Sequence, residues 1–127
     1  MGFGPLRFLY VGTKDAGRDA AWYVKGGARL LWKKQAFGAE VACLDVGPGP
    51  LLLLADHRKA GTVLPIWEVD DLKAEVTRLQ KAGWVAEGGP FEVPNGPCRL
   101  FKDPSGNELC LLEDQRPDPF GTGSTRK

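Results

Sequence analysis

The fold is decided by two similar stretches, Gly49-Pro-Leu-Leu-Leu-Leu-Ala-Asp56 and Asn107-Glu-Leu-Cys-Leu-Leu-Glu-Asp114. In each, a turn residue leads into a short apolar run that closes on an aspartate, a pattern typical of a buried strand. Superimposing the two stretches sets residues 6–55 against residues 64–112, with a period of about 57 residues. We therefore expect an internal repeat of two modules.

Working outward from these stretches, each half contains one helix and four strands. Asp15 and the pair Asp70-Asp71 supply carboxylates that can cap helix N-termini, while Gly26 and Gly83 provide the stops. The predicted strands, between turn residues, are Leu6–Val11, Arg29–Trp32, Val41–Val46, Leu51–Ala55, Leu64–Val69, Trp84–Glu87, Pro97–Phe101 and Glu108–Leu112. Gly88-Gly89-Pro90 predicts a loop.

This order predicts an α+β fold in one domain, residues 1–127, built from two βαβββ modules of about residues 5–56 and 63–113. One helix per module covers one face of its sheet. Two modules side by side then form a curved mixed sheet with helices on the outer face and a concave cup that can hold a small molecule. The polar tail, residues 114–127, is expected to fray, although Phe120 could dock on a neighbouring surface.

Composition excludes several classes of partner. The 127 residues carry 17 basic and 16 acidic side chains, so there is no basic surplus for nucleic acid or an anionic membrane. The longest apolar run, Leu51–Ala55, is too short to span a bilayer, and residues 1–12 lack the features of a signal peptide. Three cysteines without a CxxC pair (Cys43, Cys98 and Cys110) indicate reduced, buried thiols and a cytoplasmic protein.

The sequence resembles the vicinal-oxygen-chelate superfamily, which includes glyoxalase I, extradiol dioxygenases and bleomycin-resistance proteins. The resemblance covers about residues 5 to 113. It is carried by Phe8-Leu-Tyr-Val11, the helix Asp15…Arg18…Trp22-Tyr23, Pro65-Ile-Trp-Glu-Val-Asp-Asp-Leu72 and Phe101-Lys-Asp-Pro-Ser-Gly-Asn-Glu-Leu109. It implies one glyoxalase- or bleomycin-resistance-like domain.

The resemblance also implies a metal position. In enzymes of the superfamily, four side chains of the cup floor, typically His or Glu, bind a divalent metal. The matching positions here are Leu6 or Phe8, then Leu53, Leu64 and Cys110. Three apolar side chains and one thiol cannot hold a hard or borderline divalent ion. We therefore expect no metal and no cofactor.

Strand alternation predicts which residues face the cup. In the first strand one face carries residues 6, 8 and 10, and in the fifth the corresponding face carries residues 64, 66 and 68. Trp67 has the parity of the helix-packed face, and the facing of Trp32 is open. On the register that the resemblance implies, the expected ligand-binding wall is Leu6, Phe8, Tyr10, Trp32, Leu53, Leu64, Ile66 and Cys110.

Two side chains are weak catalytic candidates. Glu68 could act as a general base, because an apolar cup raises a carboxyl pKa; alternatively it meets solvent or an arginine at the rim. His57, the single histidine, could do acid–base work, although a polar connector favours an exposed loop residue. The Cys110 thiol is expected to be inert, since no activating cation is evident in the sequence.

These features predict a protein that binds a small apolar or aromatic molecule in the cup without a metal. The bleomycin-resistance branch, which sequesters its ligands and acts as dimers, implies a homodimer here. The alternative is a lyase- or isomerase-type enzyme that uses Glu68 or His57 for acid–base chemistry.

Overall fold

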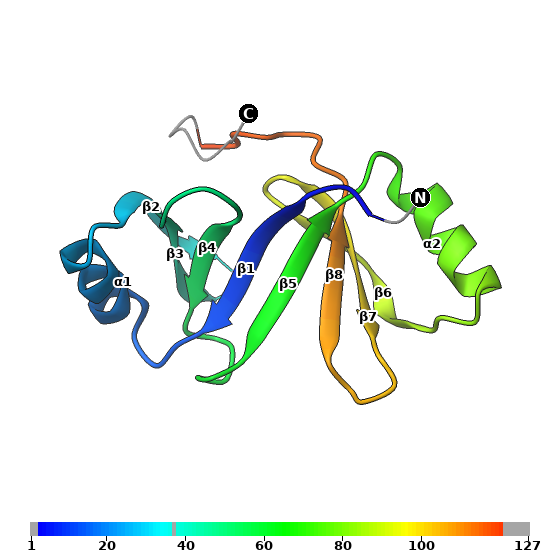
Figure 1. Cartoon of the computed structure of the whole chain (residues 1–127), viewed down its shortest axis with the longest axis horizontal. Helices are drawn as coiled ribbons and strands as arrows, with labels where there is room; N and C mark the ends of the chain where they lie inside the picture. The colour runs from blue at the N-terminus through cyan, green and yellow to red at the C-terminus, as the bar shows by residue number, and fades with distance from the viewer. Residues whose placement is uncertain (1–2, 37, 121–127) are drawn as a thin grey trace.

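A single eight-stranded sheet, with one helix near each end, forms the body of the molecule (Figure 1). The computed structural model describes residues 3–36 and 38–120. The elements are β1 (Leu6–Gly12), α1 (Ala16–Lys25), β2 (Arg29–Ala36), β3 (Ala39–Asp45), β4 (Leu51–Ala55), β5 (Val63–Glu68), α2 (Leu72–Lys81), β6 (Ala86–Val93), β7 (Gly96–Lys102) and β8 (Glu108–Leu112). Within the described residues, neither helix is long and apolar enough to cross a membrane.

The sheet has the strand order β2-β3-β4-β1-β5-β8-β7-β6. Each module pairs its first and last strands in parallel, β1 with β4 and β5 with β8. The modules join where β1 runs antiparallel to β5, with Phe8 opposite Ile66 and Tyr10 opposite Leu64. The two modules therefore pair within one chain, and the predicted α+β fold of two βαβββ modules is confirmed.

Both helices begin at the predicted caps. The Arg18 backbone N–H donates to the Asp15 carboxylate at 2.9 Å, and the Ala74 N–H donates to the Asp71 carboxylate at 3.1 Å. Each carboxylate thus satisfies one of the backbone donors that a helix N-terminus leaves without a partner. Two carboxylates therefore fix where the two helices start.

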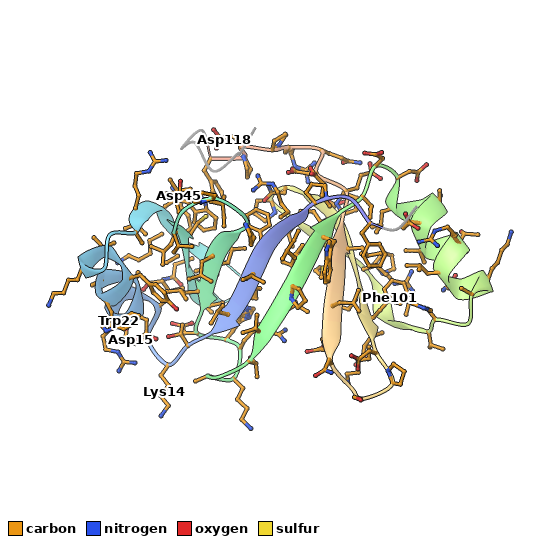
Figure 2. All side chains as sticks on the ribbon, viewed as in Figure 1. Lys14, Asp15, Trp22, Asp45, Phe101 and Asp118 are labelled. Atoms are coloured by element: carbon orange, nitrogen blue, oxygen red, sulfur yellow. The ribbon has the colours of Figure 1, made fainter. Side chains whose placement is uncertain are left out.

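The helices cover the outer face of the sheet. Ala16 and Ala20 of α1 pack on an apolar cluster of the first module, and α2 packs on a matching cluster of the second. Phe101, fully buried, lies between the sheet and α2 (Figure 2). Trp67 also packs in the cluster against α2, as its position in the strand alternation predicts. The opposite face is left to a third apolar cluster, to which both modules contribute.

Several predicted boundaries need correction. The stretch Gly88-Gly89-Pro90 lies inside β6 rather than in a loop. Because β6 is at the edge of the sheet, a proline without an N–H is tolerated there. The register shifts between Glu87 and Phe91, so this edge is locally irregular. The hairpin of β2 and β3 is longer than predicted, because pairing continues to Ala36 and Ala39 beside Gly38, whose φ is 72°.

Candidate ligand cavity

The concave face encloses a cavity of about 350 Å³. All eight strands contribute to its wall, including Trp32 from one end strand and Phe91 from the other. End strands can meet at one cavity only if the sheet curls strongly, so the expected cup is present as a curved surface. The sequence-predicted residues that line it are Phe8, Tyr10, Trp32, Leu53, Leu64, Ile66 and Cys110.

Leu6 is not among the lining residues, and a β-bulge explains why. Leu6 lies opposite Trp67 and Phe8 lies opposite Ile66, so Arg7 is an extra residue on β1. Directly opposed residues share a face of the sheet. Leu6 therefore lies on the outer face with Trp67, whereas simple alternation had predicted that its side chain faces the cup.

The cavity floor consists of Phe8, Leu53, Leu64 and Cys110, the positions that the resemblance matched to metal ligands. In the sheet, Tyr10 lies opposite Leu53 of β4 and Leu64 of β5. Ile66 of β5 lies opposite Phe8 of β1 on one side and Cys110 of β8 on the other. Three of the four floor side chains have no lone pair to donate. The described residues contain no group of three or more His, Cys, Asp or Glu that could share a metal ion. This donor set does not fit the divalent metal of the superfamily.

Two buried thiols line the far wall, on the neighbouring strands β7 and β8. Cys98 and Cys110 are each only 1% exposed. The hydrogen bond between the Cys98 and Cys110 thiols, which favours protonated Cys98, and then burial raise the pKa of Cys98. Since the thiolate is the nucleophilic form, Cys98 is held in its unreactive state. Cys43 is also buried, so all three cysteines lie in the interior.

A polar corner interrupts the apolar wall where the β4–β5 connection meets the cavity. It consists of Tyr10, His57 and Arg58. The Tyr10 hydroxyl oxygen lies 2.7 Å from Nε2 of His57 in a hydrogen bond. Burial raises the pKa of Tyr10 to about 12, which the Arg58 charge opposes and the Asp56 charge supports. Arg58 Nη2 donates to Glu108 Oε1 at 2.9 Å. His57 is solvent-exposed, as predicted, yet its ring borders the cavity.

Glu68 does not line the cavity, although the expected facing of β5 had grouped it with Leu64 and Ile66 on the cup side. It ends β5 and borders a separate depression with Phe3–Pro5 and the start of α2. Burial and the charge of Asp114 raise the pKa of the Glu68 carboxyl, while Arg7 lowers it. The raised pKa therefore belongs to a carboxylate that is remote from the enclosed space.

Residues 114–120, which we call the strap, cross the side of the sheet opposite the β4–β5 connection (Figure 1). Figure 2 places Asp118 above the strands of the first module. The Arg7 side chain anchors the strap, since its Nε donates to Asp114 Oδ2 at 3.2 Å and its Nη2 donates to the Pro117 carbonyl at 3.2 Å. This part of the tail is packed rather than frayed, and residues 121–127 lie outside the described residues.

The strap also closes on the cavity wall. Asn95 Nδ2 donates to the Arg116 carbonyl at 3.3 Å, and the Arg116 N–H donates back to the Asn95 carbonyl at 2.8 Å. Farther along, the Phe120 ring meets Trp32 edge-on with centroids 4.9 Å apart, and Phe120 lines the cavity. The strap thus contacts both modules and contributes Phe120 to the cavity wall.

This architecture is the vicinal-oxygen-chelate fold. Among solved structures, the chain is similar to methylmalonyl-CoA epimerase from Mycobacterium tuberculosis, with a TM-score of 0.75 at 17% identity over 86% of this chain and 87% of that one. A methylmalonyl-CoA epimerase in complex with methylmalonyl-CoA and NH4+ gives a TM-score of 0.74 at 13% identity, over 91% and 97% of the two chains. No protein-family model and no curated protein matches the sequence. At these identities the likeness defines the fold.

Proposed function

We propose that this chain binds a small apolar or aromatic molecule in its cavity, without a metal. The observation that carries this proposal is the floor of Phe8, Leu53, Leu64 and Cys110 at the positions where the superfamily places metal ligands. Hydrocarbon side chains in an enclosed space favour ligands that themselves lose apolar surface to water.

The size and the walls of the cavity support the same proposal. About 350 Å³ is within the usual range of small-molecule sites. Aromatic rings stand on three sides, with Phe8 on the floor, Phe91 on β6, and the Trp32–Phe120 pair at the strap. Rings placed this way can contact a planar ligand through their faces and edges.

Calorimetric titration with 2-naphthylmethanol, a neutral aromatic probe, tests the proposal. We expect saturable binding at one site per chain. Phe8→Leu, which keeps the core apolar but removes a ring, should weaken the affinity about tenfold, or 1.4 kcal/mol. The control is Trp22→Phe, at a side chain 70% exposed on α1 and outside the cavity, which should bind normally. Failure of the wild-type chain to bind apolar or aromatic compounds would contradict the proposal.

A second candidate is an isomerase or lyase that uses His57 and Tyr10. The hydrogen bond between these two side chains at the cavity supports it, because an imidazole and a hydroxyl in contact can move a proton to or from a bound substrate. The fold likeness to methylmalonyl-CoA epimerases points the same way. Deuterium exchange into methylmalonyl-CoA in heavy water tests this candidate. An enzyme should lose exchange in His57→Gln while it still binds the substrate, and no exchange in the wild-type chain contradicts the candidate.

A further inference from the structure

We infer that the ligand of this cavity is a carboxylic acid with an apolar or aromatic body, and that Arg58 holds its carboxylate. The inference rests on the proposed binding function and specifies the chemistry of the ligand. It starts from buried N–H donors that have no partner among the described residues. Two of these atoms, Nε of Arg58 and Nε1 of Trp32, belong to side chains that line the cavity.

Both atoms are N–H donors and neither can accept a hydrogen bond. A buried donor without an acceptor is unfavourable, and native structures rarely leave one. The polar groups that complement this wall are therefore acceptors. A ligand whose polar atoms are donors, such as a protonated amine, would give the N–H groups of Arg58 and Trp32 no acceptor. It would also place a second positive charge beside the guanidinium.

The guanidinium of Arg58 already forms one ion pair. Its Nη2 donates to Glu108 Oε1 at 2.9 Å, while its Nε–H has no acceptor in the part of the chain that the structure describes. The guanidinium group presents its N–H bonds in a fixed planar fork that matches the two oxygens of a carboxylate. The side chains of Arg58 and Glu108 are 23% and 30% exposed, so this ion pair is at the rim and can share the guanidinium with an incoming anion.

The other charges near the corner leave room for a ligand anion. The Asp56 carboxylate, which acts on Tyr10, accepts the Glu40 backbone N–H at 3.1 Å in the neighbouring strand connection. The Tyr10 hydroxyl is engaged with His57 beside Arg58. Beyond this corner the wall is mostly hydrocarbon and aromatic, with the Asn95 amide and two thiols, which suits the body of the ligand. A carboxylate at one end of an apolar molecule fits this division.

Three probes of one shape test the inference by calorimetry at neutral pH: 2-naphthoate, 2-naphthylmethanol and 2-naphthylmethylamine. We expect the wild-type chain to bind naphthoate about tenfold more tightly than the alcohol, with the amine weakest. Arg58→Met should remove the preference, so that naphthoate and the alcohol bind with about equal affinity. Arg29→Met is the matched control, since Arg29 is 71% exposed and pairs with Asp45 away from the cavity.

Two further variants keep the test decisive if Arg58→Met does not fold. Arg58→Lys keeps the charge but loses the planar fork, so most of the preference should disappear. Glu108→Gln frees the guanidinium from its counter-ion and should strengthen naphthoate binding. Equal affinity for naphthoate and the alcohol in the wild-type chain, or a preference that survives in Arg58→Met, would overturn the inference alone. Failure of all three probes to bind would overturn the proposed function with it.

Discussion

Arg7 and Asp114, separated by 107 positions in sequence, form an ion pair in which the two side chains are only 7% and 2% exposed. The guanidinium also lies over the Phe8 ring, 4.4 Å from its centroid. The first strand, the cavity floor and the strap therefore meet at one arginine. Because both charges are buried, the loss of one removes the ion-pair partner of the other from the interior.

Asp114→Ala should lower the free energy of unfolding by about 3–5 kcal/mol, because it leaves Arg7 buried without its carboxylate. Glu87→Ala is the control: its ion pair with Lys102 joins side chains that are 40% and 47% exposed, and the expected loss there is at most about 1 kcal/mol. Urea denaturation followed by circular dichroism measures both. Equal, small losses would show that the strap is not anchored by this pair.

Gly12 fixes the loop that carries His57 and Arg58. A Cβ at position 12 would lie 2.0 Å from the Lys59 carbonyl oxygen, and the Gly12 N–H donates to the Thr62 carbonyl at 2.9 Å. Gly12→Ala should therefore displace the loop, weaken the Tyr10–His57 hydrogen bond and lower the stability. Gly89→Ala is the matched control, since a Cβ there meets nothing within 4 Å. Proton NMR of the single histidine reports the loop, and an unchanged His57 spectrum in Gly12→Ala would contradict this account.

Phe120 shields Trp32 from solvent. The Phe120 ring lies edge-on to the indole, and Lys34 Nζ lies over the Phe120 ring, 5.4 Å from its centroid. Phe120→Ala should raise the fraction of tryptophan fluorescence that acrylamide quenches. The increase should vanish in the double variant Phe120→Ala/Trp32→Phe, which assigns it to Trp32 among the four tryptophans. Quenching that does not change in Phe120→Ala would show that the strap leaves Trp32 open.

The Tyr10 hydroxyl should titrate at high pH. Burial raises its pKa from 10.0 to about 12, so the protonated hydroxyl is favoured in the folded state. Its contribution to stability is complete below pH 10 and is lost as the pH rises through about 12. Ultraviolet titration of the phenolate should show this transition in the wild-type chain and in Tyr23→Phe, but not in Tyr10→Phe. A transition that persists in Tyr10→Phe would assign it elsewhere.

Homodimerisation stays a prediction of the resemblance. Both modules already pair within the chain, so the edges that remain for a second copy are β2 and β6. Pro90 and the register shift disrupt β6, which favours β2 as the strand that is covered. Light scattering at micromolar concentration should give the mass of two chains, and the mass of a single chain would contradict the prediction.

The sequence predicts those parts of the structure that follow a local period. Alternation along a strand placed Phe8, Tyr10, Leu64 and Ile66 on one face, and the cavity wall contains all four. Alternation fails at Leu6, because Arg7 is an extra residue in a β-bulge. The bulge turns the Leu6 side chain to the face opposite that of Phe8. A bulge of this kind leaves no periodic mark, so the position of Leu6 could be found only from the register with β5.

The polar corner and the strap could not be predicted because they depend on contacts between distant residues. Tyr10 and His57 are 47 positions apart, and Arg58 and Glu108 are 50 apart. His57 and Arg58 look like an ordinary polar connector until the sheet closes around them. The strap is held by individual side chains, Arg7 and Asn95, rather than by an apolar stripe, so its composition resembles that of a frayed tail.

The Arg7–Asp114 ion pair has a consequence for the order of events at the ribosome. Domains fold as units while the chain emerges from the N-terminus onward. Arg7 is among the first residues of the sheet to leave the tunnel, whereas its carboxylate partner follows the last strand. The Arg7 guanidinium therefore lacks this carboxylate until translation has passed Asp114, and only then can the ion pair that attaches the strap to the first strand form.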